Sequence, residues 1–124
     1  MDDSILAPHL MNAIAAVPLK GKVAFVTGSG RGLGRTIAEK LMSLGADLVL
    51  HDISEEAPAR FGEVESLSAL AKQLSVEGRQ ALAVTGDISD NDAVEAMVKR
   101  AERELGPISI LVNCAGGDIG ADGN

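Results

Sequence analysis

Residues 27–34 carry the residue types that hold a phosphate group. They read Thr-Gly-Ser-Gly-Arg-Gly-Leu-Gly and follow directly on the short apolar run 23–27. Glycine lets a backbone approach an anion closely, and the first N–H groups of a following helix can donate to that anion. A helical apolar pattern begins at residue 32, so we expect strand, turn and helix in succession. The predicted anion site comprises Gly28, Ser29, Arg31, Gly32 and Leu33.

The glycine spacing separates this turn from two common phosphate motifs. A G-x-G-x-x-G pattern started at Gly28 reaches Leu33 instead of its last glycine, and the Lys of a P-loop is missing. The spacing that fits is T-G-x-x-x-G-x-G, from Thr27 to Gly34. A tight glycine turn without a ligand is the alternative, but its place between strand and helix favours a dinucleotide site.

Asp52 ends the second apolar run, 18 positions after Gly34, and Ile53 follows it. A carboxylate near this spacing can accept hydrogen bonds from the adenine-ribose hydroxyls of NAD and would repel the extra phosphate of NADP. Arg31 favours NADP instead, because a guanidinium can pair with the extra phosphate of that cofactor. The alternative is that Asp52 is an ordinary solvated residue and Arg31 an ordinary surface residue, with neither binding a cofactor. We favour NAD over NADP, and expect His51 at the surface or in support of the site.

The elements that must position these residues alternate along the chain. Apolar runs at 23–27, 48–52, 81–84 and 108–112 predict strands. Helical spacing predicts helices over 32–44, from 64 to near Gly78, and over 94–105. Ser89 and Asp92 have the spacing of a capping box before the last helix, and 52–65 is expected to be a solvated connection. Strands that alternate with helices predict an α/β fold with a parallel sheet.

Composition excludes several classes of function. The chain has 124 residues, 46% of them hydrophobic, and a net charge of −7, which disfavours nucleic acid and anionic membranes as partners. One cysteine allows no internal disulfide, and the acidic start does not fit a signal peptide. The uncharged stretch 4–19 is too short to span a bilayer. We therefore predict a cytoplasmic protein. No cluster of His, Cys, Asp or Glu residues has metal-ligand spacing, so we predict no metal site.

Two later motifs complete a resemblance. Gly86-Asp87-Ile88 follows the third predicted strand, and Asn113-Cys114-Ala115-Gly116 follows the fourth. With the glycine turn, these motifs make residues 19–120 closely resemble the short-chain dehydrogenase/reductase family. The resemblance implies a Rossmann-type parallel sheet with helices on both faces, holding the first four strands, in order 3-2-1-4, of a doubly wound fold. It also implies an NAD(P)-dependent oxidoreductase that interconverts an alcohol and a carbonyl, both small molecules.

The same resemblance implies roles for single residues. Gly28, Arg31, Gly32 and Leu33 would surround the pyrophosphate and its ribose, and Asp52 would hold the adenine ribose. Cys114 replaces the family's usual second Asn, and we expect a small buried hydrophobe there. Asp87 would accept from the adenine amino group with Ile88 beside the ring, and Asn113, Ala115 and Gly116 would line the path to the nicotinamide ribose.

The family's Ser and Y-x-x-x-K residues have no counterpart here, and the chain contains no Tyr. We therefore expect no catalytic residue in this chain and no activity from it alone. The expected organisation is an N-terminal arm at 1–20, a dinucleotide-binding half-domain at 21–116 and a glycine-rich, truncated end at 117–124. The fourth strand would be an exposed apolar edge. A complete chain is expected to form homo-oligomers.

Two other functions stay open at this point. The chain could be a half-domain that binds a dinucleotide without catalysis. It could also be an adenosylmethionine-dependent methyltransferase, which likewise places an acidic residue after its second strand. The motif at 113–116 argues against the methyltransferase.

Overall fold

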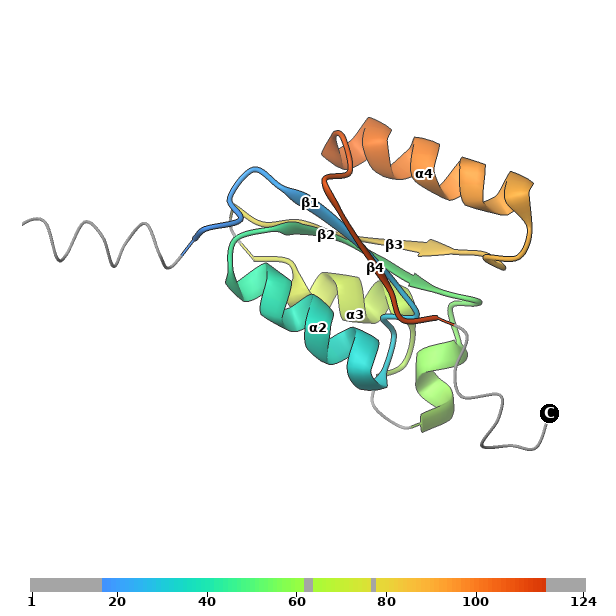
Figure 1. Cartoon of the computed structure of the whole chain (residues 1–124). Helices are drawn as coiled ribbons and strands as arrows, with labels where there is room; N and C mark the ends of the chain where they lie inside the picture. The colour runs from blue at the N-terminus through green and yellow to red at the C-terminus, as the bar shows by residue number, and fades with distance from the viewer. Residues whose placement is uncertain (1–16, 62–63, 77, 116–124) are drawn as a thin grey trace, which may run out of the picture.

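The computed structural model describes residues 17–61, 64–76 and 78–115. Within them lies a parallel sheet of four strands: β1 (Val23–Thr27), β2 (Asp47–Asp52), β3 (Ala81–Thr85) and β4 (Ile110–Asn113). Their order is β3-β2-β1-β4, which confirms the predicted Rossmann-type arrangement (Figure 1). Most of the predicted arm, Gly116 and the predicted end at 117–124 fall outside the described residues.

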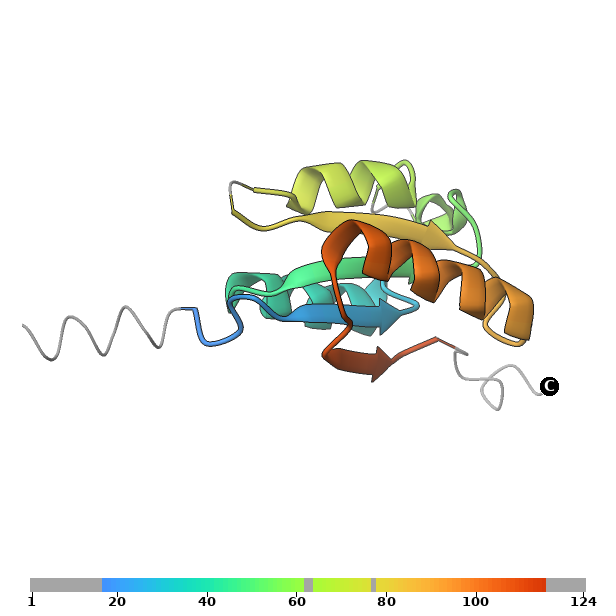
Figure 2. The ribbon, with the colours of Figure 1, turned by 90° about the horizontal axis from the view of Figure 1, so that it is seen from above.

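Helices cover both faces of the sheet, as predicted. Helices α2 (Gly32–Ser43) and α3 (Leu67–Leu74) lie on one face, and α4 (Asn91–Leu105) lies on the other (Figures 1 and 2). Alternate residues of each strand pack against the helices on opposite faces of the sheet, because successive side chains in a strand point to opposite faces. Ala24, Val26, Leu48 and Leu50 pack with α2 and α3, whereas Val23, Phe25, Val49 and Val84 pack with α4.

Strand β4 forms an apolar edge of the described sheet, as expected. It pairs with β1 from Ile110 to Asn113, and Leu111 is 62% exposed. Beside it, a hollow between the sheet and α4 is lined by Phe25, Met97 and Leu111, among others. An apolar edge strand of this kind can add further backbone pairing.

The predicted cap of α4 is wrong by one residue. Asp90 is the N-cap, and its carboxylate accepts from the N–H groups of Asp92 and Ala93. The hydroxyl of Ser89 instead donates to Asp87 at 2.7 Å. An aspartate one position nearer the helix offers the orphaned amides a charged acceptor, so it takes the cap in place of the serine.

The connection after β2 is more ordered than predicted. It contains the short 3-10 helix η1 (Ala57–Phe61), with Ala57 and Pro58 buried, so it is not merely solvated. The carboxylate of Glu55 accepts from the N–H and the hydroxyl of Ser68, both at 2.9 Å. These bonds tie the connection to the start of α3, which begins at Leu67 instead of near 64 and ends well before Gly78.

Candidate functional site

A cleft of about 470 Å³ lies where the four strands end. Carboxyl ends of parallel strands meet at one edge of the sheet, so the segments that follow all four strands reach it. The cleft is lined by most of the predicted site residues, namely Gly28, Arg31, Gly32, Leu33, Asp52, Ile53, Asp87, Ile88 and Ala115. It is also lined by four residues that were not among the predicted site residues: Gly34, His51, Gly86 and Cys114.

Backbone contacts exclude a side chain at Gly28, in the turn between β1 and α2, and at Gly34, in the first turn of α2. Gly28 has a φ of +63°, and a β-carbon there would come within 2.9 Å of the Cα of Ala115. A β-carbon at Gly34 would run into the carbonyl oxygen of Gly28. Both contacts are with backbone, which cannot rotate away as a side chain could. The two glycines therefore let the turn close tightly against the end of β4.

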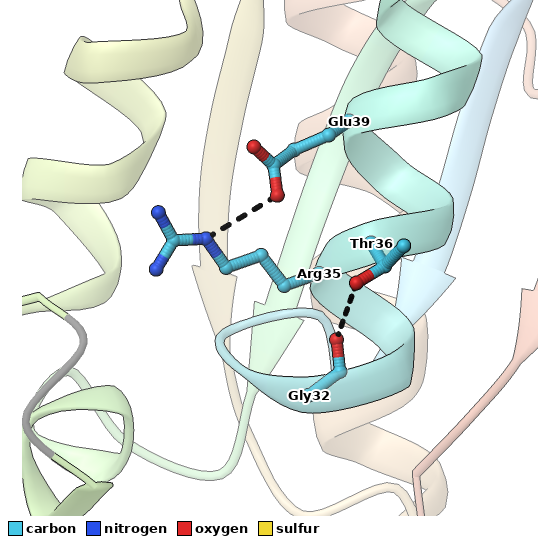
Figure 3. A network of polar contacts seen from close by, with 4 residues as sticks. All are labelled: Gly32, Arg35, Thr36 and Glu39. Carbon is cyan, nitrogen blue, oxygen red and sulfur yellow. Dashed lines mark hydrogen bonds and ion pairs between the residues drawn. The ribbon is translucent and has the colours of Figure 1, made fainter.

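The first turn of α2 faces the cleft with its N-terminal end. Arg31 is the N-cap residue and makes no side-chain cap hydrogen bond. The leading amides of a helix have no partner within the helix, so this end attracts an anion. Thr36 donates to the carbonyl of Gly32 at 3.2 Å, and Arg35 pairs with Glu39 at 3.5 Å (Figure 3). These contacts run along the helix, away from its leading amides.

Two carboxylates stand at the cleft. Asp52 Oδ1 accepts from the N–H of Ile53 at 2.9 Å. Asp87 Oδ1 accepts from the hydroxyl of Ser89 at 2.7 Å and from its N–H at 2.9 Å. The hydroxyl bond, and then the amide bond, hold the pKa of Asp87 below its ordinary value because both favour the charged form. Carboxylate oxygens accept hydrogen bonds, so the cleft combines acceptors with the donors of α2.

The hydroxyl of Thr27 joins the ends of β1 and β4. It accepts from the N–H groups of Cys114 and Ala115 at 3.0 and 3.1 Å, and lies 3.5 Å from the carbonyl oxygen of Val112. The hydroxyl fixes the backbone at 114–115 against the glycine turn. Cys114 packs against the core on the α2 and α3 side, but it is half-buried and lines the cleft, so it is less buried than predicted.

Of the predicted site residues that the structure describes, Ser29 and Asn113 do not line the cleft. Ser29 is fully buried, where its hydroxyl accepts from the His51 N–H at 2.9 Å, so it supports the turn from behind. Asn113 is exposed and lines the hollow between β4 and α4. His51 is 2% exposed, so a surface position is wrong, and a role in support of the site stays a prediction.

No helix among the described residues has the length and apolar character needed to cross a membrane. In the same part of the chain, no group of three or more His, Cys, Asp or Glu side chains is arranged to hold a metal ion.

Comparison with known proteins identifies the family. The short chain dehydrogenase profile matches residues 22–123, so the chain belongs to this family. It is 39% identical over 98 residues to 2,3-dihydro-2,3-dihydroxybenzoate dehydrogenase of Bacillus subtilis, covering 79% of this chain and 34% of that protein. The match gives no support to the methyltransferase alternative.

Solved structures of other short-chain dehydrogenases support the same family. A short chain dehydrogenase from Mycobacterium thermoresistibile is 36% identical with a TM-score of 0.70, over 81% of this chain and 35% of that one. A metagenomic short-chain oxidoreductase in complex with NADP is 37% identical with a TM-score of 0.64, over 79% and 40%. The chain thus spans between a third and two fifths of the length of these relatives.

Proposed function

We propose that this chain is the cofactor-binding part of an NAD(P)-dependent oxidoreductase that interconverts an alcohol and a carbonyl of a small molecule. The observation that carries the proposal is the cleft, which combines an open helix N-terminus with two carboxylates at neighbouring strand ends. Family membership supports the same reading. The half-domain at 21–116 is the part that we assign to the cofactor.

The residues present fit a dinucleotide. A β-carbon at Gly32 would meet no atom within 4 Å, so there is open space in front of the first turn of α2. A pyrophosphate needs donors there, and helix amides provide them. Ribose hydroxyls and an adenine amino group are donors, and they need acceptors such as the carboxylates of Asp52 and Asp87. Exposed apolar side chains at Leu33, Ile53 and Ile88 offer surface for the flat ring and the sugars.

The bound cofactor would supply hydride transfer, and this chain's residues would supply binding and orientation. Asp52 would hold the adenine ribose, and Asp87 the adenine amino group beside Ile88. Arg31, Gly32 and Leu33 would surround the pyrophosphate, with Gly28 at the base of the turn. Ala115, together with Asn113 and Gly116, would lead towards the nicotinamide ribose.

We propose NAD as the preferred cofactor. Asp52 supports this preference, because its carboxylate accepts ribose hydroxyls and repels a 2′-phosphate. Arg31 supports the opposite preference, and so do two structural relatives, one solved in complex with NADP and one with NADPH. Titration of each dinucleotide into the protein decides between them. Tighter binding of NAD supports the role of Asp52, and tighter binding of NADP contradicts it.

The test of the oxidoreductase proposal compares two proteins. The full-length protein is assayed with NAD or NADP and a panel of secondary alcohols, by the absorbance of the reduced nicotinamide. We expect turnover there, and none above background from the 124-residue chain, which contains no Tyr to act as a general acid. Failure of the full-length protein with every alcohol and with the matching carbonyls would contradict the proposal. A cytoplasmic location and homo-oligomers stay predictions.

A further inference from the structure

We propose that His51 is a positioning residue that holds the glycine turn in the form that binds the dinucleotide. The inference rests on the proposed function and goes beyond it, because no cofactor contact is assigned to this side chain. The imidazole lies at the base of the cleft and joins the segments that follow β1 and β3, which are far apart in the sequence.

The hydrogen bonds of the imidazole fix its protonation state. The N–H of Gly28 donates to His51 Nδ1 at 3.1 Å, and His51 Nε2 lies 2.8 Å from the carbonyl oxygen of Gly86. A backbone N–H can only donate and a carbonyl can only accept. Nδ1 must therefore be bare and Nε2 must carry the proton. The geometry requires a neutral ring in the Nε2–H form.

The backbone of the same residue binds the turn as well. The N–H of Ser29 donates to the carbonyl of His51 at 2.8 Å, and the N–H of His51 donates to Ser29 Oγ at 2.9 Å. The amides of Gly28 and Ser29 are thus both occupied by His51. Phosphate donors must then come from the following residues, 30–34. His51 decides which amides of the turn face the ligand.

Acid should release this arrangement. Protonation would place a second N–H on Nδ1, opposite the N–H of Gly28, and two donors cannot bond to each other. A turn that faces a protonated Nδ1 would therefore lose its anchor. The other titratable or charged side chains that line the cleft are Arg31, Asp52, Asp87 and Cys114.

A matched pair of variants isolates the acceptor at Nδ1. In His51→Asn the amide oxygen can sit where Nδ1 sits, whereas His51→Leu has similar bulk and no acceptor. Both variants lose the bond to Gly86, so they differ in the bond to Gly28. We expect the dissociation constant for NAD to rise roughly tenfold in H51L. H51N should recover most of that loss, and its affinity should fall less steeply with acid than that of the wild type.

The experiment has three readouts in the full-length protein: the tautomer of His51 by nitrogen NMR, the dissociation constant for NAD and for NADP, and its dependence on pH. An Nδ1–H tautomer in the wild type would overturn the inference without any variant. Wild-type affinity in H51L, or equal pH slopes in wild type and H51N, would overturn it too. A wild type that binds neither dinucleotide would instead defeat the proposed function, and the inference with it.

Discussion

The carboxylate of Asp52 lies directly against Gly30, so that a β-carbon at position 30 would come within 2.5 Å of Asp52 Oδ2. The same β-carbon would come within 2.6 Å of Pro58 Cγ in the buried start of η1. The missing side chain at position 30 therefore gives the carboxylate its place at the cleft. Gly30 was not among the predicted site residues, because its importance arises from a contact 22 positions along the chain.

Gly30→Ala should change the cofactor preference. The new methyl group would force the Asp52 side chain to rotate, since a side chain yields more easily than backbone. We expect weaker binding of NAD, by roughly tenfold for a lost charge-assisted hydrogen bond, and little change for NADP. Calorimetric titration with both dinucleotides measures the ratio. Asp52→Asn is the matched control and should shift the ratio in the same direction; an unchanged ratio in both variants would contradict the role of Asp52.

Thr27→Val should loosen the end of β4. The amides of Cys114 and Ala115 would lose their shared acceptor while the side chain keeps its shape. Leaving such groups unsatisfied costs about 1–3 kcal/mol of unfolding free energy. Denaturant unfolding measures this loss. Thr27→Ser keeps the hydroxyl and should retain more stability than the valine variant; equal stability of the two variants would show that the hydroxyl is not what matters.

Gly34→Ala should damage both stability and cofactor binding. Its β-carbon would press on the carbonyl of Gly28 and force the turn open, at a cost of about 1–3 kcal/mol. Gly21→Ala is the control. Gly21 has a φ of +83° and open space around it, ahead of β1, so alanine there costs about 1 kcal/mol through backbone strain alone. Dinucleotide affinity should fall in G34A and stay unchanged in G21A, and a G34A protein that binds normally would refute the tight-turn argument.

Ser89→Ala should raise the pKa of Asp87 towards its ordinary value, because the hydroxyl bond is the largest cause of the lowering. The amide bond from residue 89 remains, so the return should be partial. A lowered pKa in the folded state stabilises the protein above the unfolded pKa, and that stabilisation is lost as the pH falls through the folded value. The variant should therefore lose less stability on acidification.

Carbon NMR titration of the Asp87 carboxyl group measures this shift directly. Ser68→Ala is the matched control, since that hydroxyl donates to Glu55 instead, and it should leave the Asp87 titration in place. An Asp87 titration that does not move in the Ser89 variant would mean that the hydroxyl bond has no influence on the charge.

Local patterns predicted the alternating strands and helices and the place of Asp52, whereas the sheet order and the role of Asp87 were implied by the family resemblance. Asp52 and Asp87 each follow an apolar run, and the ends of parallel strands must meet at one edge. Pattern reasoning failed where a partner lies far along the chain. The ring of His51 bonds to Gly28 and Gly86, which are 23 and 35 positions away, and nothing near His51 in the sequence signals either bond.

The segment 52–65, which was predicted to be a solvated connection, shows that composition also misses single contacts. Its many acidic residues predicted exposure, yet Glu55 uses its charge to hold the start of α3, and Pro58 is buried close to Gly30. Composition reports the average solvation of a segment, whereas these two residues are placed by single contacts. The error at the N-cap of α4 has another cause. Ser89 and Asp90 are adjacent and both can cap a helix, so the spacing alone does not decide between them.

The most direct test of the cofactor site is an amide NMR titration of the full-length protein with NAD. We expect saturable shifts at the amides of residues 31–34 and at Asp87, which together line one cleft. The amides around Leu111, in the hollow beside α4, should move least. Saturable shifts confined to the cleft would support a dinucleotide site there. An absence of saturable shifts with both NAD and NADP, or shifts centred on the hollow beside α4, would contradict it.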